Sequence, residues 1–361
     1  MRDDIINRGD GQQMSNPQSF LRAGYFLALA FVTMPALSQT GTIGAATWRD
    51  PANWRGVKVT ETDNIVFATV PRIPNPSAAA SPDPGVPAGI REPIANTGAT
   101  GTVDLHVDVY QVASATPTPV IIQIHGGGWL RGDRPSSSTS FGGFFAAGMS
   151  VVTVQYRNAV DAPAPGAIQD VRCAMAWVKA NATKYNFDLS RVVALGNSAG
   201  GHLALMAGYA PASFNPAGCT DQPRVVAVLD NYGPTNLAEG LTQKGSTDFT
   251  HQWLGLDLPI ASVQTTADAG RGGKPSAPRW PEPSAALLAR AKEMSPLTYV
   301  RAGVPPTFIV NGDSDRTVDP SQSSELKKAL DDAHIPNGQD LIVGAGPVSY
   351  THLTLPTNRE V

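Results

Sequence analysis

The sequence has little of what several protein classes depend on. Two cysteines in 361 residues are too few for a scaffold held by disulfides or for a zinc site built on CxxC pairs. Charged residues make up only 16% of the chain and the net charge is −3, so there is no basic excess that predicts binding to nucleic acid or an anionic membrane. Hydrophobic residues make up 42%, which is enough for a large core in one or two domains.

The apolar run near the N-terminus, residues 23–37, is too short for a transmembrane helix, which needs ~20 apolar residues. Arg22 precedes the run, and Ala36-Leu37-Ser38 follows it as a cleavage site of small residues. This order of features is typical of a secretory signal peptide. We expect residues 1–38 to be removed and the mature, secreted or periplasmic protein to begin at Gln39, without a membrane span. An uncleaved anchor or a core helix is the alternative.

Export would place Cys173 and Cys219 in an oxidising compartment, where they are able to pair. Cys173 lies on the apolar side of an expected helix, so a buried free thiol is the simpler expectation. The sequence leaves the pairing open.

From residue 103 onward, short apolar runs alternate with helical segments. Such runs indicate strands buried on both faces of a parallel sheet, and the helices between them indicate right-handed crossovers. We therefore predict an α/β fold, with a doubly wound and mostly parallel sheet, over residues 103–346. The expected strands are 103–112, 120–125, 151–156, 192–195, 225–229, 307–311 and 341–343.

Two stretches fall outside this alternation. Residues 39–102 are predicted to be a Pro/Gly-rich N-terminal segment leading into the fold, irregular from 47 to 90, with a loop rich in Pro, Ala and Ser at 71–87. Residues 236–294 form a Gly/Pro-rich insertion before the strand at 307. Insertions of this kind commonly form lids over active sites.

The pentapeptide Gly196-Asn197-Ser198-Ala199-Gly200 lies between an expected strand and an apolar helical segment. A serine hydroxyl is a poor nucleophile unless it is lifted out of the sheet beside a base. Glycines two residues before and after it allow the tight strand-to-helix turn that does this, and the helix start supplies N–H groups and a positive dipole end. We predict that Ser198 is a catalytic nucleophile; an ordinary glycine-rich turn is the alternative.

A second motif, His125-Gly126-Gly127-Gly128-Trp129, directly follows the expected strand at 120–125. Consecutive glycines free the backbone to aim N–H groups at a developing oxyanion. We predict an oxyanion hole formed by the amides of Gly126, Gly127 and Ala199. His125 is expected to support this loop rather than to act as a base.

In this order, the motifs HGGGW (125–129), GNSAGGHLALMAG (196–208), NYGPTNL (231–237), MSPLTYV (294–300) and VNGDSDRTV (310–318) resemble the hormone-sensitive-lipase-like esterases of the α/β-hydrolase fold. Within this branch the chain is most similar to bacterial secreted carboxylesterases that include feruloyl- and acetyl-esterase-like members. The resemblance covers residues 103–346, about two thirds of the chain. It implies a serine carboxylesterase with a Ser-Asp-His triad.

In that family the triad acid follows a strand in a G-x-x-D pattern, which falls here on Gly312-Asp313-Ser314-Asp315. The resemblance therefore implies that Asp315 orients the catalytic histidine. Asp313 and Asp319 are the alternatives, as loop carboxylates. Asp170 and Asp230 fit structural roles better.

The expected histidine is missing from its usual place. In the family it follows the last strand in a G-x-G-H-like turn, but here Gly344-Ala345-Gly346 is followed by Pro347. The tail 347–361, PVSYTHLTLPTNREV, can be back-translated into a transposon-library sequencing adaptor, an index and a stop codon. We therefore expect a non-native tail and a base encoded naturally at position 347. His352 would replace that base only by accident.

These observations predict a secreted serine carboxylesterase acting through an acyl-enzyme on small-molecule or polysaccharide-linked esters. The chain as given, without its base, is expected to be nearly inactive. No metal, organic cofactor or nucleic-acid partner is implied, because no HExxH, GxGxxG or P-loop motif occurs. The alternatives are a serine peptidase of the same fold and a non-catalytic pseudo-hydrolase that binds a partner.

Overall fold

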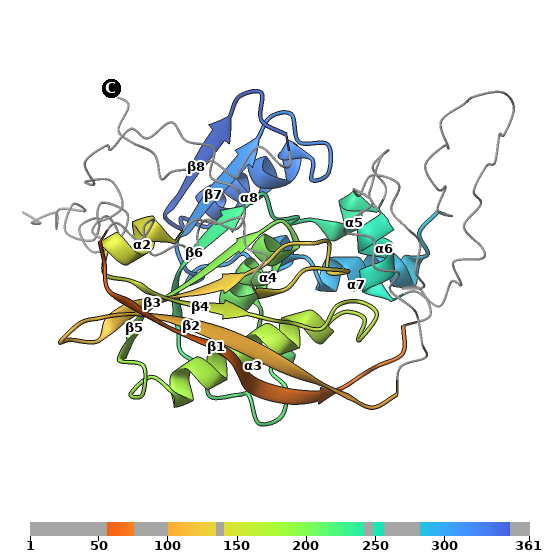
Figure 1. Ribbon diagram of the computed structural model, residues 1–361. Coiled ribbons are helices and arrows are strands. Elements are labelled where there is room, and N and C mark those ends of the chain that lie inside the picture. Colours follow the sequence, from red (N-terminus) through yellow and green to blue (C-terminus); the bar gives the residue numbers. More distant parts are fainter. Residues whose placement is uncertain (1–55, 76–99, 135–140, 242–247, 256–281, 347–361) are drawn as a thin grey trace, which may run out of the picture. The chain divides into compact units, whose positions relative to one another are not determined.

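A mostly parallel sheet of eight strands forms the centre of the computed structural model (Figure 1). The structure describes residues 56–75, 100–134, 141–241, 248–255 and 282–346. The strand order is β1-β2-β4-β3-β5-β6-β7-β8. β2 is antiparallel to both of its neighbours, and all the other pairs are parallel. The strands are β1 (Val59–Pro71), β2 (Thr102–Val112), β3 (Thr118–Ile124), β4 (Ser150–Val154), β5 (Phe187–Asn197), β6 (Val225–Asn231), β7 (Thr307–Gly312) and β8 (Asn337–Ile342).

The central strands show why the predicted α/β fold is confirmed. Every residue of β4 is buried, and β3 has a single half-buried residue. Their sequences, TPVIIQI and SVVTV, therefore lie in a layer covered on both faces, as continuous apolar runs indicate. All seven predicted strands occur, although β5 and β8 begin several residues earlier than their apolar runs.

The prediction of irregular chain over 47–90 was wrong for β1. This strand of 13 residues pairs antiparallel with β2 at the edge of the sheet. Its sequence, VTETDNIVFATVP, is mostly exposed, so it lacks the continuous apolar run that identified the inner strands. A bulge between Thr62 and Ile65, with Asn64 at φ 55°, further interrupts its alternation.

Helices flank the sheet, and their packing follows their apolar spacing. α4 packs against β3, β5 and β6, and α8 packs against β7 and β8. In α3 the apolar residues at 168, 171, 175 and 178 recur at helical spacing, and all four are buried. No helix among the described residues is long and apolar enough to cross a bilayer. The helices are α2 (Gly142–Ala146), α3 (Gly166–Ala180), α4 (Ala199–Tyr209), α5 (Leu237–Gly240), α6 (Asp248–Leu254), α7 (Ala285–Glu293) and α8 (Pro320–Asp332), with short 3-10 turns η5 (Ala212–Phe214) and η7 (Pro296–Tyr299).

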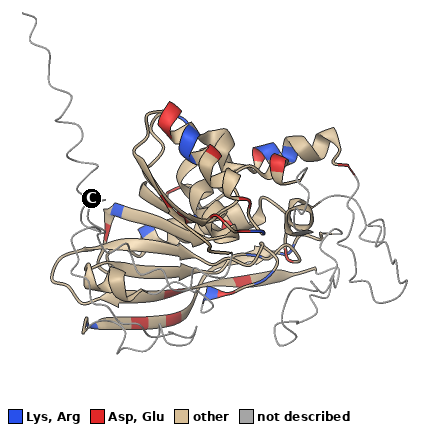
Figure 2. Ribbon diagram, turned by 90° about the horizontal axis from the view of Figure 1, so that it is seen from above, with Lys and Arg blue, Asp and Glu red and all other residues tan. Residues whose placement is uncertain are grey.

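Charged residues gather away from the central strands. Figure 2 shows Lys, Arg, Asp and Glu mainly on outer helices and on the outermost strand. On α8, Leu326 and Leu330 face the core, whereas Lys327 and Lys328 form exposed pairs with aspartates one turn further along. Two buried ion pairs are exceptions, and one of them joins Arg157 to Asp170 at 2.8 Å, in agreement with a structural role for Asp170.

The expectation of a free thiol at Cys173 was wrong, because Cys173 and Cys219 form a disulfide. Cys173 does lie on the buried face of α3, as predicted, with 7% of its surface exposed. That face also meets the segment that follows α4. The adjacent Arg172 donates hydrogen bonds to the carbonyl groups of Met206, Ala207 and Ala210 at the end of α4. The apolar spacing of α3 indicated burial but gave no information on which segment covers it.

Candidate active site

Ser198 lies in the sharp turn between β5 and α4, where the sequence predicts it. Its backbone has φ 54° and ψ −123°, a strained conformation for a residue with a side chain. Hydrogen bonds hold the turn, from Ser198 N–H to Asn231 O at 2.8 Å and from His202 N–H to Ser198 O at 3.1 Å. Ser198 lines a cleft, so the turn has the geometry that a nucleophile at a strand-to-helix junction requires.

The glycines on either side of Ser198 permit close approaches of the backbone. A methyl group on Gly196 would overlap the carbonyl group of Gly200, and one on Gly200 would overlap the carbonyl group of Ile124. The end of β3, the end of β5 and the start of α4 therefore meet only because both positions lack a side chain.

The three glycines of the HGGGW loop have different surroundings. A side chain on Gly126 would lie 3.4 Å from Ser198 Cβ, so the loop lies directly against the serine turn. Gly127 and Gly128 have φ +121° and +63°. Gly128 and Ala199 line the cleft, whereas Gly126 and Gly127 are not among its lining residues. The oxyanion hole of Gly126, Gly127 and Ala199 stays a prediction, and Gly128 is a further candidate that the sequence analysis missed.

His125 supports the glycine loop from within the core. It is 2% exposed, its ring stacks on that of Tyr156 with centroids 4.2 Å apart, and its Nδ1 lies 2.8 Å from Gly126 O. The Tyr156 hydroxyl donates to His125 O at 3.0 Å. Burial lowers the pKa of His125 to about 4, so the ring is neutral near pH 7. His125 therefore holds the loop, as expected, and does not line the cleft.

Asp315 lines the same cleft from the loop after β7. It is 6% exposed, and its Oδ1 accepts the N–H groups of Thr317 at 2.7 Å and Val318 at 3.1 Å. Its Oδ2 is buried and has no hydrogen-bond partner. Burial raises the pKa of Asp315 because the charged form loses hydration. A free acceptor of this kind is what a triad acid needs in order to bind the ring N–H of a histidine.

The two alternative acids have other contacts. Asp313 Oδ1 accepts the N–H of Gly344 at 2.7 Å, and Asp313 does not line the cleft. Asp319 lines the cleft but caps α8, because its Oδ1 accepts the N–H of Ser321 at 2.9 Å. Asp315 is therefore the carboxylate that combines a position in the cleft with a buried oxygen that has no hydrogen-bond partner.

Within the described part of the chain, no histidine lines the cleft. His202 is fully buried in α4, with Nε2 2.8 Å from Met294 O, and its ring lies edge-on to Trp129 and Trp253. His352 and the rest of the predicted non-native tail lie outside the described residues. The described residues thus bring together a candidate nucleophile and a candidate acid without a base. They also contain no group of three or more His, Cys, Asp or Glu that is arranged to hold a metal ion.

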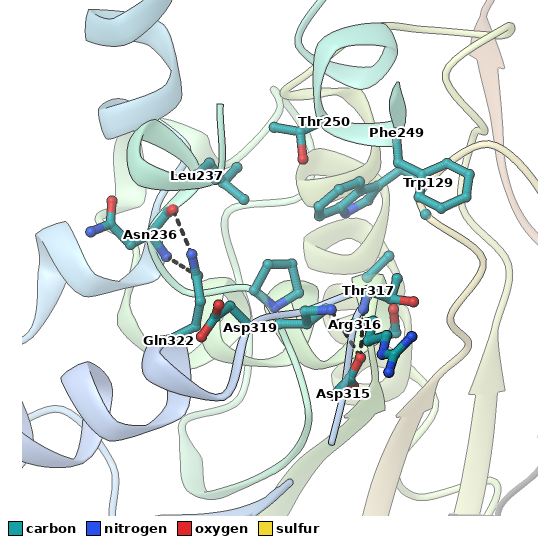
Figure 3. Close-up of a pocket in the computed structure, with 16 residues that line it drawn as sticks. Trp129, Asn236, Leu237, Phe249, Thr250, Asp315, Arg316, Thr317, Asp319 and Gln322 are labelled. Carbon is teal, nitrogen blue, oxygen red and sulfur yellow. Dashed lines mark hydrogen bonds between the residues drawn. The ribbon is translucent and has the colours of Figure 1, made fainter. Parts of the chain in front are cut away.

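The cleft has a volume of about 300 Å³ (Figure 3). Its walls are the glycine loop with the start of α4, the acid loop at 315–319, and the predicted insertion 236–294. From the predicted insertion, five residues between 236 and 250 line the cleft, and residues 242–247 and 256–281 lie outside the described residues. The lining residues are Gly128, Trp129, Ser198, Ala199, Pro234, Asn236, Leu237, Gly240, Phe249, Thr250, Asp315, Arg316, Thr317, Val318, Asp319 and Gln322.

Several lining residues were missed because no local pattern marks them. The ring of Phe249 lies against Gly128 and under the guanidinium group of Arg131, at 5.2 Å from its centroid. Gln322 reaches the cleft from α8. Trp129, which belongs to the predicted HGGGW motif, also lines the cleft, and its ring stacks at 4.5 Å on the fully buried Trp253.

The comparisons with known proteins agree with this arrangement. Residues 107–270 and 274–330 match the family described as BD-FAE, which is more than half of the chain. Esterase LipQ of Mycobacterium tuberculosis is 26% identical over 253 residues, 68% of this chain and 52% of that protein. Carboxylesterase NlhH of the same organism is 37% identical over 145 residues, 39% of this chain and 43% of that protein. The chain spans about half the length of the curated relatives it matches.

Similar solved structures include a truncated carbohydrate esterase from gut microbiota. It has a TM-score of 0.53 and 23% identity, and the match covers 79% of this chain and 91% of that chain. The apo form of Thermogutta terrifontis esterase 2 has a TM-score of 0.52 and 24% identity, with coverage of 69% and 81%. These likenesses show that the fold is that of the α/β-hydrolase esterases, as the motifs implied.

Proposed function

Because this chain belongs to the BD-FAE family, we propose that it hydrolyses carboxylic esters through an acyl-enzyme. The observation that carries the proposal is the strained turn of Ser198, which lines a cleft together with Asp315. The names of the curated relatives, which include esterases and carboxylesterases, support an ester as the substrate. Small-molecule esters and esters on polysaccharides are the two candidate kinds.

In the proposed reaction, the Oγ of Ser198 attacks the ester carbonyl carbon while the base takes the hydroxyl proton. The carbonyl oxygen becomes an oxyanion, which the N–H groups of Ala199 and the 126–128 loop stabilise. Collapse of this intermediate breaks the bond to the alcohol, which leaves with the proton from the base. Water, activated by the same base, then attacks the acyl-enzyme and releases the carboxylic acid and free Ser198.

We assign the base to a histidine at the position after Gly346. The chain leaving β8 runs along the acid loop, since Ser314 N–H donates to Ala345 O at 3.1 Å and a side chain on Gly346 would lie 3.7 Å from Ser314 O. Gly346, the last described residue, therefore lies beside Ser314, which directly precedes Asp315. This placement supports the sequence prediction that a natural histidine stands where Pro347 stands here.

Export is part of the proposal, with residues 1–38 as the signal peptide. The disulfide between Cys173 and Cys219 supports an oxidising compartment. N-terminal sequencing of the exported protein should begin at Gln39. An unprocessed product inside the cell would contradict this part of the proposal.

The catalytic proposal is tested with p-nitrophenyl acetate and with a fluorophosphonate probe. The full chain carrying Pro347→His should hydrolyse the ester, and mass spectrometry should find the phosphonyl group on Ser198. Ser198→Ala in that chain is the control and should abolish both signals. Equal turnover with and without Ser198 would overturn the proposed function.

A further inference from the structure

Gln322 is buried at the third position of α8, 3% exposed, and its side chain turns away from its own helix. Asp319 is the N-cap residue of α8, so a glutamine here is expected to reach back to the N-cap N–H in a capping box. Instead, Oε1 of Gln322 accepts the N–H groups of Thr235 and Asn236, each at 2.7 Å. Its Nε2 donates to Asn236 O at 3.0 Å. The side-chain amide of Gln322 thus makes the hydrogen bonds to the 235–236 backbone that a neighbouring strand would otherwise make.

A second set of contacts reinforces this connection, which we call the α8 clamp (Gln322, Glu325, Thr235 and Asn236). The Thr235 hydroxyl donates to Gln322 O at 2.8 Å, and Asn236 Nδ2 donates to Glu325 Oε2 at 3.1 Å. Figure 3 shows the amide of Gln322 pointing at Asn236 at the side of the cleft. Buried hydrogen bonds that satisfy one another hold a geometry firmly, because breaking one leaves a desolvated polar group.

The α8 clamp joins two walls of the cleft. α8 continues directly from the acid loop 315–319, and the 234–237 segment opens the insertion; both line the cleft, and so does Gln322. On its far side the insertion wall is anchored separately, by the Leu237 N–H that donates to Ser295 Oγ at 2.9 Å. Gln322 therefore bonds the start of α8, next to the acid loop, directly to the backbone of the insertion wall.

We infer that Gln322 is a positioning residue that sets the width of the cleft and so the size of the ester group that it accepts. The inference rests on the proposed esterase function for the nature of the ligand. Gln322 would act on substrate selection indirectly, because its side-chain amide holds the backbone of Thr235 and Asn236 in the wall of the cleft.

The test measures binding without turnover. In a Ser198→Ala background, calorimetry gives the Kd of p-nitrophenyl acetate, butyrate, hexanoate and octanoate, and of a second series in which the alcohol is lengthened instead. Gln322→Leu keeps the approximate volume and removes the hydrogen bonds of the Gln322 side-chain amide. The bonds from the Thr235 hydroxyl to Gln322 O and from Asn236 Nδ2 to Glu325 Oε2 do not use this amide. We expect the ratio of Kd values between the shortest and longest members of at least one series to change by about tenfold, in favour of the longer group.

Gln339→Leu is the matched control, because Gln339 donates a similar bond, to Asn311 Oδ1 at 2.8 Å, but does not line the cleft. Both variants should lower Tm, while only Gln322→Leu should change the binding profile and speed amide exchange at 235 and 236. The inference would be overturned if Gln322→Leu left the ratios of Kd values unchanged in both ester series, or if neither the parent nor the variant bound the esters. Loss of the proposed function is recognised separately, as equal turnover by the Pro347→His chain with and without Ser198→Ala.

Discussion

The serine turn and the acid loop line one cleft but differ in how completely their polar groups are paired. At the serine turn, the backbone of Ser198 is bonded on both sides, and the loop beneath is braced by His125 and Tyr156. In the acid loop, one carboxylate oxygen of Asp315 is buried without a partner. The turn that carries the proposed nucleophile is therefore fully bonded within the described chain, whereas the proposed acid has one oxygen without a donor there.

The two regions also differ in how far apart in the sequence their contacting residues lie. The serine turn is built by residues that are consecutive or on adjacent strands, so it forms whenever the sheet forms. The proposed acid and base depend on a long-range contact between the β7 loop and the chain after β8, where the N–H of Ser314 donates to Ala345 O. A change near position 347 should therefore affect the reaction while it leaves the serine turn intact.

The largest effect is expected from Pro347→His, which supplies the missing donor. A positioned general base contributes on the order of 10² to 10⁴ in rate, so kcat/KM for p-nitrophenyl acetate should rise by about that factor. Stopped-flow or plate assays of the two full chains make the comparison directly.

His352→Ala in the unchanged chain is the control for this prediction. It should leave the residual rate unaltered. A fully active unchanged chain that loses its activity through His352→Ala would show that His352 is the base and that the tail is genuine.

A smaller effect, on stability, is expected from Cys173→Ser with Cys219→Ser. The disulfide closes a loop with a sequence separation of 46 and fixes α3 to the segment after α4. Its loss should lower the free energy of unfolding by about 2–4 kcal/mol, as measured by urea unfolding. In the Pro347→His chain, fluorophosphonate labelling of Ser198 in the folded fraction should not change, because the serine turn lies at the other end of α4. A parallel loss of labelling would mean that the turn depends on this anchor.

Gly200→Ala should disturb the serine turn directly, at a cost of about 1–3 kcal/mol, since the added methyl group overlaps the carbonyl group of Ile124. The control is Gly240→Ala in α5, where the added methyl group meets nothing closer than Gln322 Nε2 at 3.9 Å. Thermal unfolding should show a lower Tm for the first variant and an equal or higher Tm for the second. Equal Tm values for parent and Gly200→Ala would show that the turn has room for a side chain.

The smallest effect concerns the pH dependence that the acid loop confers. Burial raises the pKa of Asp315 in the folded protein, so the folded state binds this proton more tightly than the unfolded state does. The contribution to stability is then complete below the ordinary carboxyl pKa of about 3.9 and is lost as pH rises through the raised value. Asparagine stays uncharged, so Asp315→Asn should not lose stability as pH rises. The Tm of the variant minus the Tm of the parent should therefore increase from pH 4 to neutral pH. A constant difference would contradict the prediction.

The sequence predicted those parts of the site that short segments define. Ser198 was predicted because its glycines and flanking strand and helix are all local, and Asp315 because the family resemblance places the triad acid in a short pattern after a strand. Phe249 and Gln322 were not found, because their places in the cleft depend on how the insertion and α8 return to the sheet. No pattern of composition or spacing carries that information.

The fold shows the same division. The inner strands were predicted because burial on both faces gives continuous apolar runs. β1 was missed because an edge strand that faces solvent has no such run, and its bulge breaks the alternation that would otherwise identify it. The pairing of Cys173 was likewise a question of tertiary contact.

β1 also has a practical consequence for producing this protein. β2 carries Leu105, Val107 and Val109, all buried, and is covered along one edge by β1. A chain trimmed to begin at residue 103, the boundary that the apolar pattern suggests, would leave β2 as a bare, apolar edge open to strands of other molecules. Exposed edges of this kind promote aggregation. The polar and bulged β1 acts as a protective cap, and expression of soluble protein should require the chain from before Val59.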